Sequence, residues 1–427
     1  MLTTALTREL GGFIAGLRYE QIPAAAISVI PTGFTDCVGV MIAGSVEPVV
    51  QLLAAALKPP PGEATLVFGQ NTAAAPEAAW INAAAAHALD FDDVALRGHP
   101  SAVLVPAILA EAQAIGASGR EMMAAYAAGY ETWAELVRRE ADHHHAKGWH
   151  PTGIFGAIAA AAACASLRKL DASKATHAIA LGASQSAGLM ANFGTMTKPF
   201  HAGRAAHAGV ISARLAGAGF TASPDALEHP QGFLSAVSPA GRIDVAMPVE
   251  AGTNWKLARD KLSVKKYPLC FCTHRALDGM LNLIAANPVA AEKVSRVKVS
   301  ISRTHATILR NHLPQTGLEA KFSMEFAMAS VLVARRAGLA ELQDDFVRRP
   351  EIQALMPRVA IEIDEREDPA APGKAIYDLV SVETTDGRRM ESARVKQVRG
   401  GPEQPLTSDE LWTKFEGCLQ VGKARVP

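Results

Sequence analysis

The chain has 427 residues, of which 49% are hydrophobic and 20% are charged, and this balance excludes a disordered or fibrous protein. Its 42 basic and 42 acidic residues cancel, so no global basic field exists to attract nucleic acid, and an anionic ligand must be bound by local cations. Charges near the N-terminus interrupt any secretory apolar core, and the cysteine count of five is odd, so we expect a cytoplasmic protein without disulfides. The length favours two domains over one.

Helical patterns dominate the first half of the chain. Apolar residues recur every three or four positions from Leu2 to about Ala56, with breaks at Pro23 and Pro31. Further helices are expected over residues 76–90, 103–115, 120–139 and 154–167, followed by one that Ser173 caps.

Two uncharged runs, residues 148–167 and 175–197, are long enough to raise the question of a membrane. Both are dominated by Ala, Gly, Ser and Thr, which are poor membrane spanners and let helix backbones approach closely. We therefore interpret both runs as helices buried inside a bundle, and we expect no membrane partner.

The pattern changes after about Lys256, where strand signals begin. Strands are expected over residues 297–301, 359–363, 376–384 and 389–396, with a helix over 320–337 between the first two. Asp386 and Gly387 separate the last two strands and are a strong hairpin signal. Thr407 and Glu410 form a capping box for a final helix.

These elements predict a mainly α protein. A large helical domain is expected over residues 1–260, completed by residues 402–427, and a smaller α+β domain over residues 261–401.

The segment from His87 to His99 crowds three carboxylates, Asp90, Asp92 and Asp93, at the end of a predicted helix, where the helix dipole disfavours anions. A helix end in water is one explanation. A site is the other, because His99 follows in a turn that can fold its imidazole back toward the acids. A histidine beside carboxylates has its pKa raised toward the range useful for proton transfer.

Three later segments also place polar groups in apolar surroundings. His150 precedes a predicted buried helix, whose N-terminus favours an anion such as a substrate carboxylate, although a capping or packing histidine is the alternative. Lys198 ends an uncharged run, so it either reaches to solvent or pairs with a buried anion. His274 lies near the expected domain junction, where ligand clefts tend to occur. Together these residues predict a proton-transfer site for an anionic substrate.

A metal site is not expected. Cys270, Cys272 and His274 could form part of a metal clip, but no second Cys/His pair follows at zinc-ligand spacing. The run His143, His144 and His145 is more typical of a solvated loop than of a ligand set.

Six motifs, in the right order over nearly the whole chain, resemble the MmgE/PrpD family. They begin at His87 (HALDFDD, then GHPS), Gly148 (GWHPTG), Thr197 (TKPFHAGRAA), Lys266 (KYPLC, then HR), Glu319 (EAKFS) and Pro405 (PLT). This family includes 2-methylcitrate dehydratase, cis-aconitate decarboxylase and iminodisuccinate epimerase. The resemblance implies an all-helical domain with an α+β lid domain, assembled as a homodimer without a metal or other cofactor.

Matching motifs place the family's active-site positions on Asp90, His99, His150, Lys198 and His274. We expect substrate-binding roles for four more residues in or beside these motifs, His201, Arg204, Lys266 and Arg275. Proton abstraction next to a carboxylate needs a base, a cation and a proton donor. Lys198 suits the cation, His99 or His150 the base, and Asp90 would orient a histidine.

Two positions depart from the decarboxylase pattern. Val94 stands where that motif has Thr, and Ile308 aligns with its Tyr. We therefore expect a hydro-lyase for a small hydroxylated di- or tricarboxylate, such as a 2-methylcitrate-like acid. The alternatives are an epimerase or isomerase of an iminodisuccinate-like dicarboxylate, a cis-aconitate-type decarboxylase, and a non-catalytic binding protein.

Overall fold

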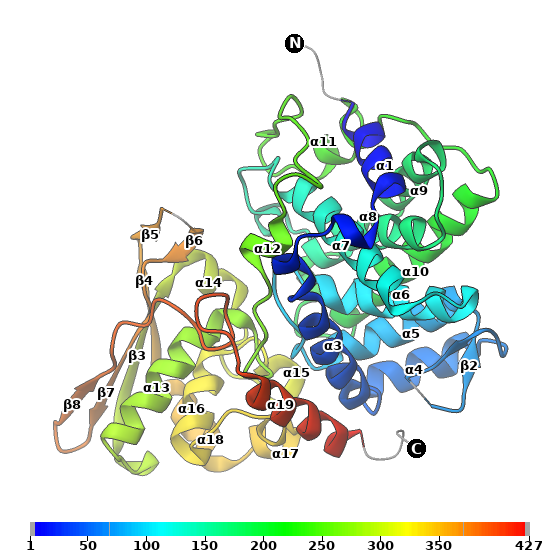
Figure 1. Ribbon diagram of the computed structural model, residues 1–427. Helices are drawn as coiled ribbons and strands as arrows, with labels where there is room; N and C mark the ends of the chain where they lie inside the picture. The colour runs from blue at the N-terminus through cyan, green and yellow to red at the C-terminus, as the bar shows by residue number, and fades with distance from the viewer. Residues whose placement is uncertain (1–4, 68, 370, 423–427) are drawn as a thin grey trace. The chain divides into compact units, whose positions relative to one another are not determined.

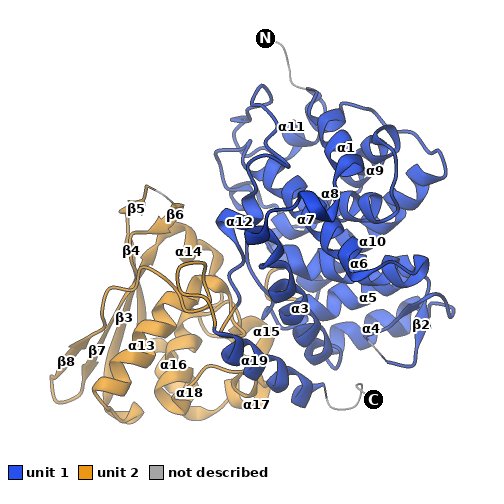
Figure 2. Cartoon of the chain, viewed as in Figure 1, with its two compact units in different colours: residues 1–192, 196–264, 407–427 blue, residues 193–195, 265–406 orange. Residues whose placement is uncertain are grey.

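The computed structural model describes residues 5–67, 69–369 and 371–422, which divide into two compact units (Figures 1 and 2). The first unit takes in the chain up to residue 192, residues 196–264 and the segment from Thr407 onward. The second consists of residues 193–195 and 265–406. Helices outnumber strands in the described chain, so the prediction of a mainly α protein is confirmed.

The first unit is built from helices. They are α1 (Leu6–Gly16), α2 (Ala24–Ile27), α3 (Ile30–Gly44), α4 (Pro48–Leu57), α5 (Ala75–Ala88), α6 (Pro100–Ile115), α7 (Gly119–Val137), α8 (Pro151–Leu167), α9 (Ala172–Ser184), α10 (Thr197–Gly217), α11 (Phe233–Val237), α12 (Lys256–Asp260) and α19 (Ser408–Val421). The sequence did not predict the short helices α11 and α12, nor a short antiparallel pair of strands, β1 (Ala64–Thr65) and β2 (Thr72–Ala73).

Helix α8 is the centre of this unit, and every residue in it except Ser166 is buried. It packs against α6, α7, α9 and α10. The backbones come very close where α10 crosses α8, because a Cβ added to Gly209 would lie only 2.2 Å from Cβ of Ala160. Small residues are therefore needed here, as the sequence predicted for residues 148–167.

The second uncharged run is not one helix, and this prediction was wrong. Helix α9 ends at Ser184, and turns with a short 3₁₀ segment (Met190–Asn192) lead to α10. Leu189 in this connection is 53% exposed. The cap of α9 also differs from the prediction, because the side chain of Asp171, rather than Ser173, accepts a hydrogen bond from Lys174 N at 2.9 Å.

Among the described residues, the segment 24–44 is the one long and apolar enough to cross a membrane by length and composition. It is divided between α2 and α3, and 56% of its apolar window is buried within the protein. Core helices pass the same test, so the segment is weak support for a membrane span.

The second unit contains a four-stranded sheet with helices against it. The strands of the whole unit, two of which lie outside this sheet, are β3 (Val294–Ser302), β4 (Val359–Asp364), β5 (Glu367–Asp368), β6 (Ala371–Ala375), β7 (Leu379–Thr384) and β8 (Arg389–Glu391). Its helices are α13 (His274–Ala286), α14 (Arg303–Ile308), α15 (Gly317–Ala320), α16 (Met324–Ala334), α17 (Asp344–Val347) and α18 (Pro350–Leu355).

The order of the main sheet is β4-β3-β7-β8, with β3 and β4 parallel and the other neighbours antiparallel. Helices α13 and α16 lie against this sheet (Figure 1). The predicted hairpin is confirmed, since β7 and β8 pair on either side of Gly387, whose φ of +80° suits glycine. The separate pair of β5 and β6 was not expected from the sequence.

Candidate active site

The loop after α5 directs its three carboxylates to three different partners. Asp90 Oδ1 lies 2.6 Å from the ammonium of Lys198, and Asp90 itself has a left-handed φ of +50°. Asp92 contacts the imidazoles of His87 and His99. Asp93 accepts a hydrogen bond from the hydroxyl of Ser101 at 2.6 Å. All three acids are buried, so the explanation of a helix end in water is wrong.

Asp93 is a structural member of this group. Ser101 on α6 also lies 2.7 Å from the hydroxyl of Tyr126 on α7, so the contact ties the loop to two core helices. Burial raises the pKa of Asp93 well above its usual range, and neighbouring Asp36 adds to the shift. Asp93 therefore holds its proton more tightly than an ordinary carboxyl, and its contacts lie within the helical core.

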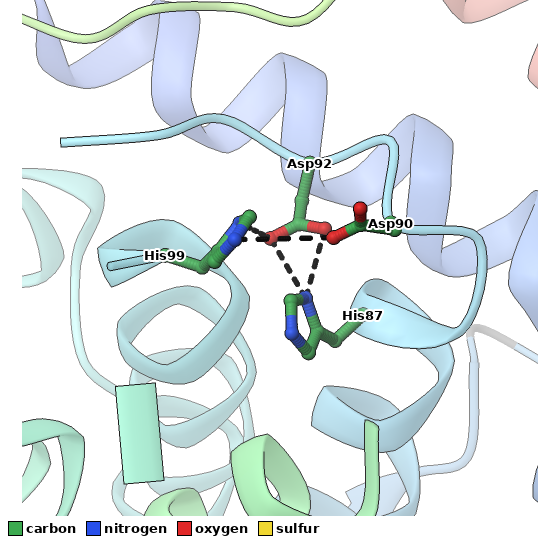
Figure 3. A group of neighbouring side chains, drawn as sticks. All are labelled: His87, Asp90, Asp92 and His99. Carbon is green, nitrogen blue, oxygen red and sulfur yellow. Dashed lines mark hydrogen bonds and ion pairs between the residues drawn. The ribbon is translucent and has the colours of Figure 1, made fainter. Parts of the chain in front are cut away.

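Asp92 lies between two imidazoles (Figure 3). Its two oxygens are 3.0 and 3.1 Å from Nδ1 of His87, and Oδ2 is 2.8 Å from Nδ1 of His99. Burial alone would raise the pKa of Asp92, but the two imidazoles outweigh burial and hold this pKa well below its usual range. Asp92 is therefore an anion.

A tight turn delivers His99 to this cluster. Ala95 and Gly98 exchange backbone hydrogen bonds of 3.0 and 2.8 Å. Leu96 and Arg97 between them have φ values of +50° and +62°, a left-handed backbone that costs free energy for residues with side chains. Such strain persists only where surrounding contacts hold it.

Side-chain contacts hold the turn in place. The indole of Trp133 donates to the carbonyl oxygen of Leu96 at 3.2 Å. The guanidinium of Arg97 donates to the carbonyl oxygens of Glu140 and Asp142 at 3.2 and 2.7 Å. The position of His99 is therefore fixed from the far side of the turn.

Lys198 supplies the cation of the cluster from the first turn of α10. Its side chain is 5% exposed and pairs with Asp90, so the sequence alternative in which it reaches to solvent is excluded. Asp90 Oδ1 is also 3.9 Å from Nε2 of His99. Asp90 was expected to orient a histidine, but its short contact is with Lys198, and the short carboxylate contact of His99 is with Asp92.

His150 and His201 meet through their Nδ1 atoms, which are 3.1 Å apart. Burial, followed by the charge of Lys198, lowers the pKa of His150 well below its usual range and that of His201 to about 4. Both rings are thus neutral, and one Nδ1 must donate while the other accepts. The side chain of His150 makes no hydrogen bond that caps α8, and its ring stacks on His87 with centroids 5.7 Å apart.

The other predicted site residues lie elsewhere. Arg204 lies over the ring of Trp80 and contacts His207, rather than the carboxylates. In the second unit, His274 opens α13, with Nε2 3.2 Å from the carbonyl oxygen of Leu269.

Two predicted substrate-binding residues also belong to the second unit. Arg275 donates to the carbonyl oxygen of Ala375 at 2.7 Å and lies 3.6 Å from buried Asp378. Lys266 is exposed and lies over the ring of Tyr267. The substrate-binding roles expected for Arg275 and Lys266 stay predictions.

His87 and Asp92 are central to the cluster, although neither residue was expected from the sequence to have a role of its own. The available signal was the crowding of acids in one segment, which indicates nearby donors. That segment does not show which acid meets which donor, because the choice depends on the fold.

The cluster also bears on the expectation that no metal binds. His87, Asp90, Asp92 and His99 offer potential ligand atoms that all lie within 4.8 Å of one another. Their spacing in sequence is unlike that of a zinc motif, so the sequence alone does not indicate a ligand set here. Asp90 is already paired with an ammonium, which repels a divalent cation, and Asp92 contacts two imidazole Nδ1 atoms. Metal independence stays a prediction.

Comparison with known proteins decides the family. Residues 8–246 match the MmgE/PrpD N-terminal domain, and residues 267–425 match the MmgE/PrpD C-terminal domain. The chain belongs to the MmgE/PrpD family. The resemblance predicted from its motifs is thereby confirmed.

Several relatives of this MmgE/PrpD chain carry the name cis-aconitate decarboxylase. The human protein is 25% identical over 430 residues, covering 97% of this chain and 88% of the relative. The mouse protein is 24% identical, covering 97% and 87%. A protein of Aspergillus terreus is 24% identical over 383 residues, covering 83% and 77%.

Proposed function

We propose that this protein is a hydro-lyase that acts on a small hydroxylated di- or tricarboxylate by removing a proton next to a carboxylate. The observation that carries the proposal is the arrangement around His99. Anionic Asp92 lies at its Nδ1, and Asp90, the partner of Lys198, lies 3.9 Å from its Nε2. The family membership supports an enzyme of the carboxylate lyase type.

His99 is the base in this proposal. A nitrogen 2.8 Å from an anionic carboxylate must carry a proton, because two lone pairs at that distance would repel. The neutral ring then has its lone pair on Nε2. The side chain of His99 is 12% exposed and that of His87 is 0% exposed, so His99 is the more accessible of the two rings.

Lys198 would stabilise the negative charge that develops on the substrate carboxylate, because a buried ammonium acts strongly on an anion. To do so it exchanges part of its contact with Asp90 for the substrate. His150 is then the proposed proton donor to the leaving hydroxide, which departs as water. The ring is neutral without substrate, and it would take up this proton when the negative charge of the bound polycarboxylate offsets the charge of Lys198. Without such a donor, expulsion of hydroxide is slow.

A second candidate, cis-aconitate-type decarboxylation, is favoured by the names of the relatives. Val94 offers no hydroxyl, and Ile308 no phenol, at the two positions where the decarboxylase pattern has them. Epimerisation of a dicarboxylate is the third candidate, since it also begins with the removal of a proton by a base. We further propose a homodimer without cofactor, and catalytic His274.

The test incubates the purified protein with hydroxylated and unsaturated polycarboxylates in deuterated water and follows the mixture by NMR. The hydro-lyase proposal expects loss of water from a hydroxy acid, or the reverse addition. Release of carbon dioxide from cis-aconitate would favour decarboxylation. Deuterium uptake with inversion of the carbon centre, and without loss of water or carbon dioxide, would favour epimerisation. His99→Gln should stop solvent deuterium from entering the substrate, and unchanged exchange would exclude His99 as the base.

A further inference from the structure

We propose that Asp92 is a positioning residue that fixes His99 as the Nδ1–H tautomer, and that His87 is the buried donor that holds Asp92 in place for this role. The consequence for turnover rests on the proposed function. The consequence for the tautomer does not, because it concerns the protein without substrate.

The contacts of Asp92 leave its carboxylate little freedom. Nδ1 of His87 lies almost equally far from both oxygens, at 3.0 and 3.1 Å, while Nδ1 of His99 approaches Oδ2 to 2.8 Å. Rotation of the carboxylate about its Cβ–Cγ bond would lengthen at least one of these contacts. His87 thus fixes the plane of the carboxylate that His99 meets (Figure 3).

Asp90 and Asp92 differ in the charge of their partners. Asp90 is paired with the ammonium of Lys198, which neutralises it. The donor to Asp92 from His87 is an uncharged ring, because burial lowers the pKa of His87 to about 3. Asp92 therefore keeps its negative charge, and that charge is directed at Nδ1 of His99. A neutral anchor holds the carboxylate without weakening its effect on the second ring.

The environment of Nε2 in His87 supports a role for this residue beyond packing. Its side chain is 0% exposed, and its Nε2 has no hydrogen-bond partner in the part of the chain that the structure describes. A buried nitrogen without a partner costs free energy. The ring also packs against two other imidazoles, with centroids 4.5 Å from His99 and 5.7 Å from His150. The Nδ1 contact with Asp92 is the contact that an apolar residue here would lose.

Asp92→Asn tests the first half of the proposal. The amide carries no negative charge, and an NH₂ donor replaces one of the two acceptor oxygens, so the force that favours a proton on Nδ1 of His99 is lost. In full-length protein labelled with ¹⁵N-histidine, we expect His99 of the wild type to show the Nδ1–H tautomer and the variant to show a mixture or the Nε2–H form. Turnover should fall on the order of 10²-fold or more with KM little changed, as expected when a base is held in the wrong tautomer. An unchanged His99 signal would overturn the role of Asp92.

His87→Asn and His87→Leu form a matched pair for the second half. The Asn side chain can place an N–H near the position of Nδ1, whereas Leu has no donor. We expect His87→Asn to keep the His99 tautomer and most of the turnover, and His87→Leu to lose both. Retention of both in the Leu variant would overturn the proposal. If the Leu variant does not fold, an Asn variant with the Nε2–H form of His99 would overturn it equally.

The Asn variant also separates positioning from direct catalysis. If it keeps the wild-type tautomer of His99 but loses turnover, His87 acts on the substrate itself, and the positioning role is wrong. The NMR arm needs no substrate. A wild-type Nδ1–H signal that changes in Asp92→Asn therefore supports this inference even if no polycarboxylate in the panel reacts, which would instead contradict the proposed function.

Discussion

The ammonium of Lys414 donates to the carbonyl oxygen of Phe91 at 2.7 Å, and Phe91 is the residue between Asp90 and Asp92. Lys414 belongs to α19 near the end of the described chain, and it also lies 2.6 Å from buried Asp36 on α3. The C-terminal helix therefore holds the backbone from which both carboxylates of the cluster project.

Lys414→Met should destabilise the first unit and reduce turnover. Removing one partner of a buried ion pair leaves the other uncompensated, which costs about 3 to 5 kcal/mol. Burial already raises the pKa of Asp36 against the pull of Lys414, so the lone carboxyl should become protonated. Urea unfolding and steady-state kinetics measure the two effects.

The double variant Asp36→Asn with Lys414→Met is the control. It replaces the lone buried carboxyl by an amide that needs no proton uptake, so it should recover much of the lost stability. The carbonyl of Phe91 still lacks its donor, so turnover should stay low. Full recovery of turnover in the double variant would show that the Phe91 contact does not position the loop.

Lys198→Ala should lower turnover by about 10² to 10³, the usual cost of removing one preorganised donor to a developing anion. Lys147→Ala is a matched control, because that ammonium donates to the carbonyl oxygens of Ala236 and Ser238 at 3.1 and 2.9 Å, and neither carbonyl belongs to the cluster. Its turnover should stay close to that of the wild type. Equal losses in the two variants would argue against a specific role for Lys198.

Gly98→Ala should displace His99 through the turn that carries it. The added Cβ would lie 2.7 Å from Cζ2 of Trp133, a distance that forces the turn or the indole to move. We expect a loss of turnover with a smaller change in the urea midpoint. Gly12→Ala on α1 meets nothing within 4 Å and should leave turnover unchanged. Wild-type activity of Gly98→Ala would mean that the turn tolerates the shift.

His207 should make the protein less stable in acid. Burial, with Arg204 beside it, lowers the pKa of His207 to about 4, below the ordinary 6.5 that the unfolded chain retains. Between these values the unfolded chain binds the proton more readily, so stability is lost as the pH falls from about 6.5 toward 4. From pH 7 to pH 4.5 this contribution is roughly 2 kcal/mol, at about 1.4 kcal/mol per pKa unit.

The measurement compares unfolding free energies of the wild type and His207→Gln at both pH values. Glutamine does not titrate, so the unfolding free energy of the wild type relative to His207→Gln should fall by roughly 2 kcal/mol between pH 7 and pH 4.5. The comparison is made between variants because other buried groups also titrate in this range. A difference that does not depend on pH would contradict the lowered pKa.

Exhaustive chelation should leave activity intact, and the purified protein should carry no stoichiometric zinc or iron. The reason is that the carboxylates of the cluster already contact Lys198 and two imidazole Nδ1 atoms. Elemental analysis and assays with EDTA check this. Activity lost on chelation and restored by one metal would reverse the prediction, and the four residues of the cluster would be the first ligands to test.

Much of the local structure could be predicted from the sequence. Helix periodicity, the hairpin at Asp386 and Gly387 and the capping box at Thr407 and Glu410 all depend on residues close together in the chain, so a short window contains the interactions that form them. A local prediction was wrong where two neighbouring side chains could both cap a helix. At the start of α9, Asp171 is the cap and Ser173 is not.

The sequence by itself also determined the family and the kinds of side chain at the site, because motifs record residue types and their order. Only the tertiary structure decided which side chains meet. Asp90 pairs with a lysine 108 positions away, and His150 with a histidine 51 positions away, because α5, α8 and α10 pack together. Asp92 reaches His99 only through a strained left-handed turn that no propensity favours. Partner choice depends on packing between distant segments, and that information is absent from any single stretch of the chain.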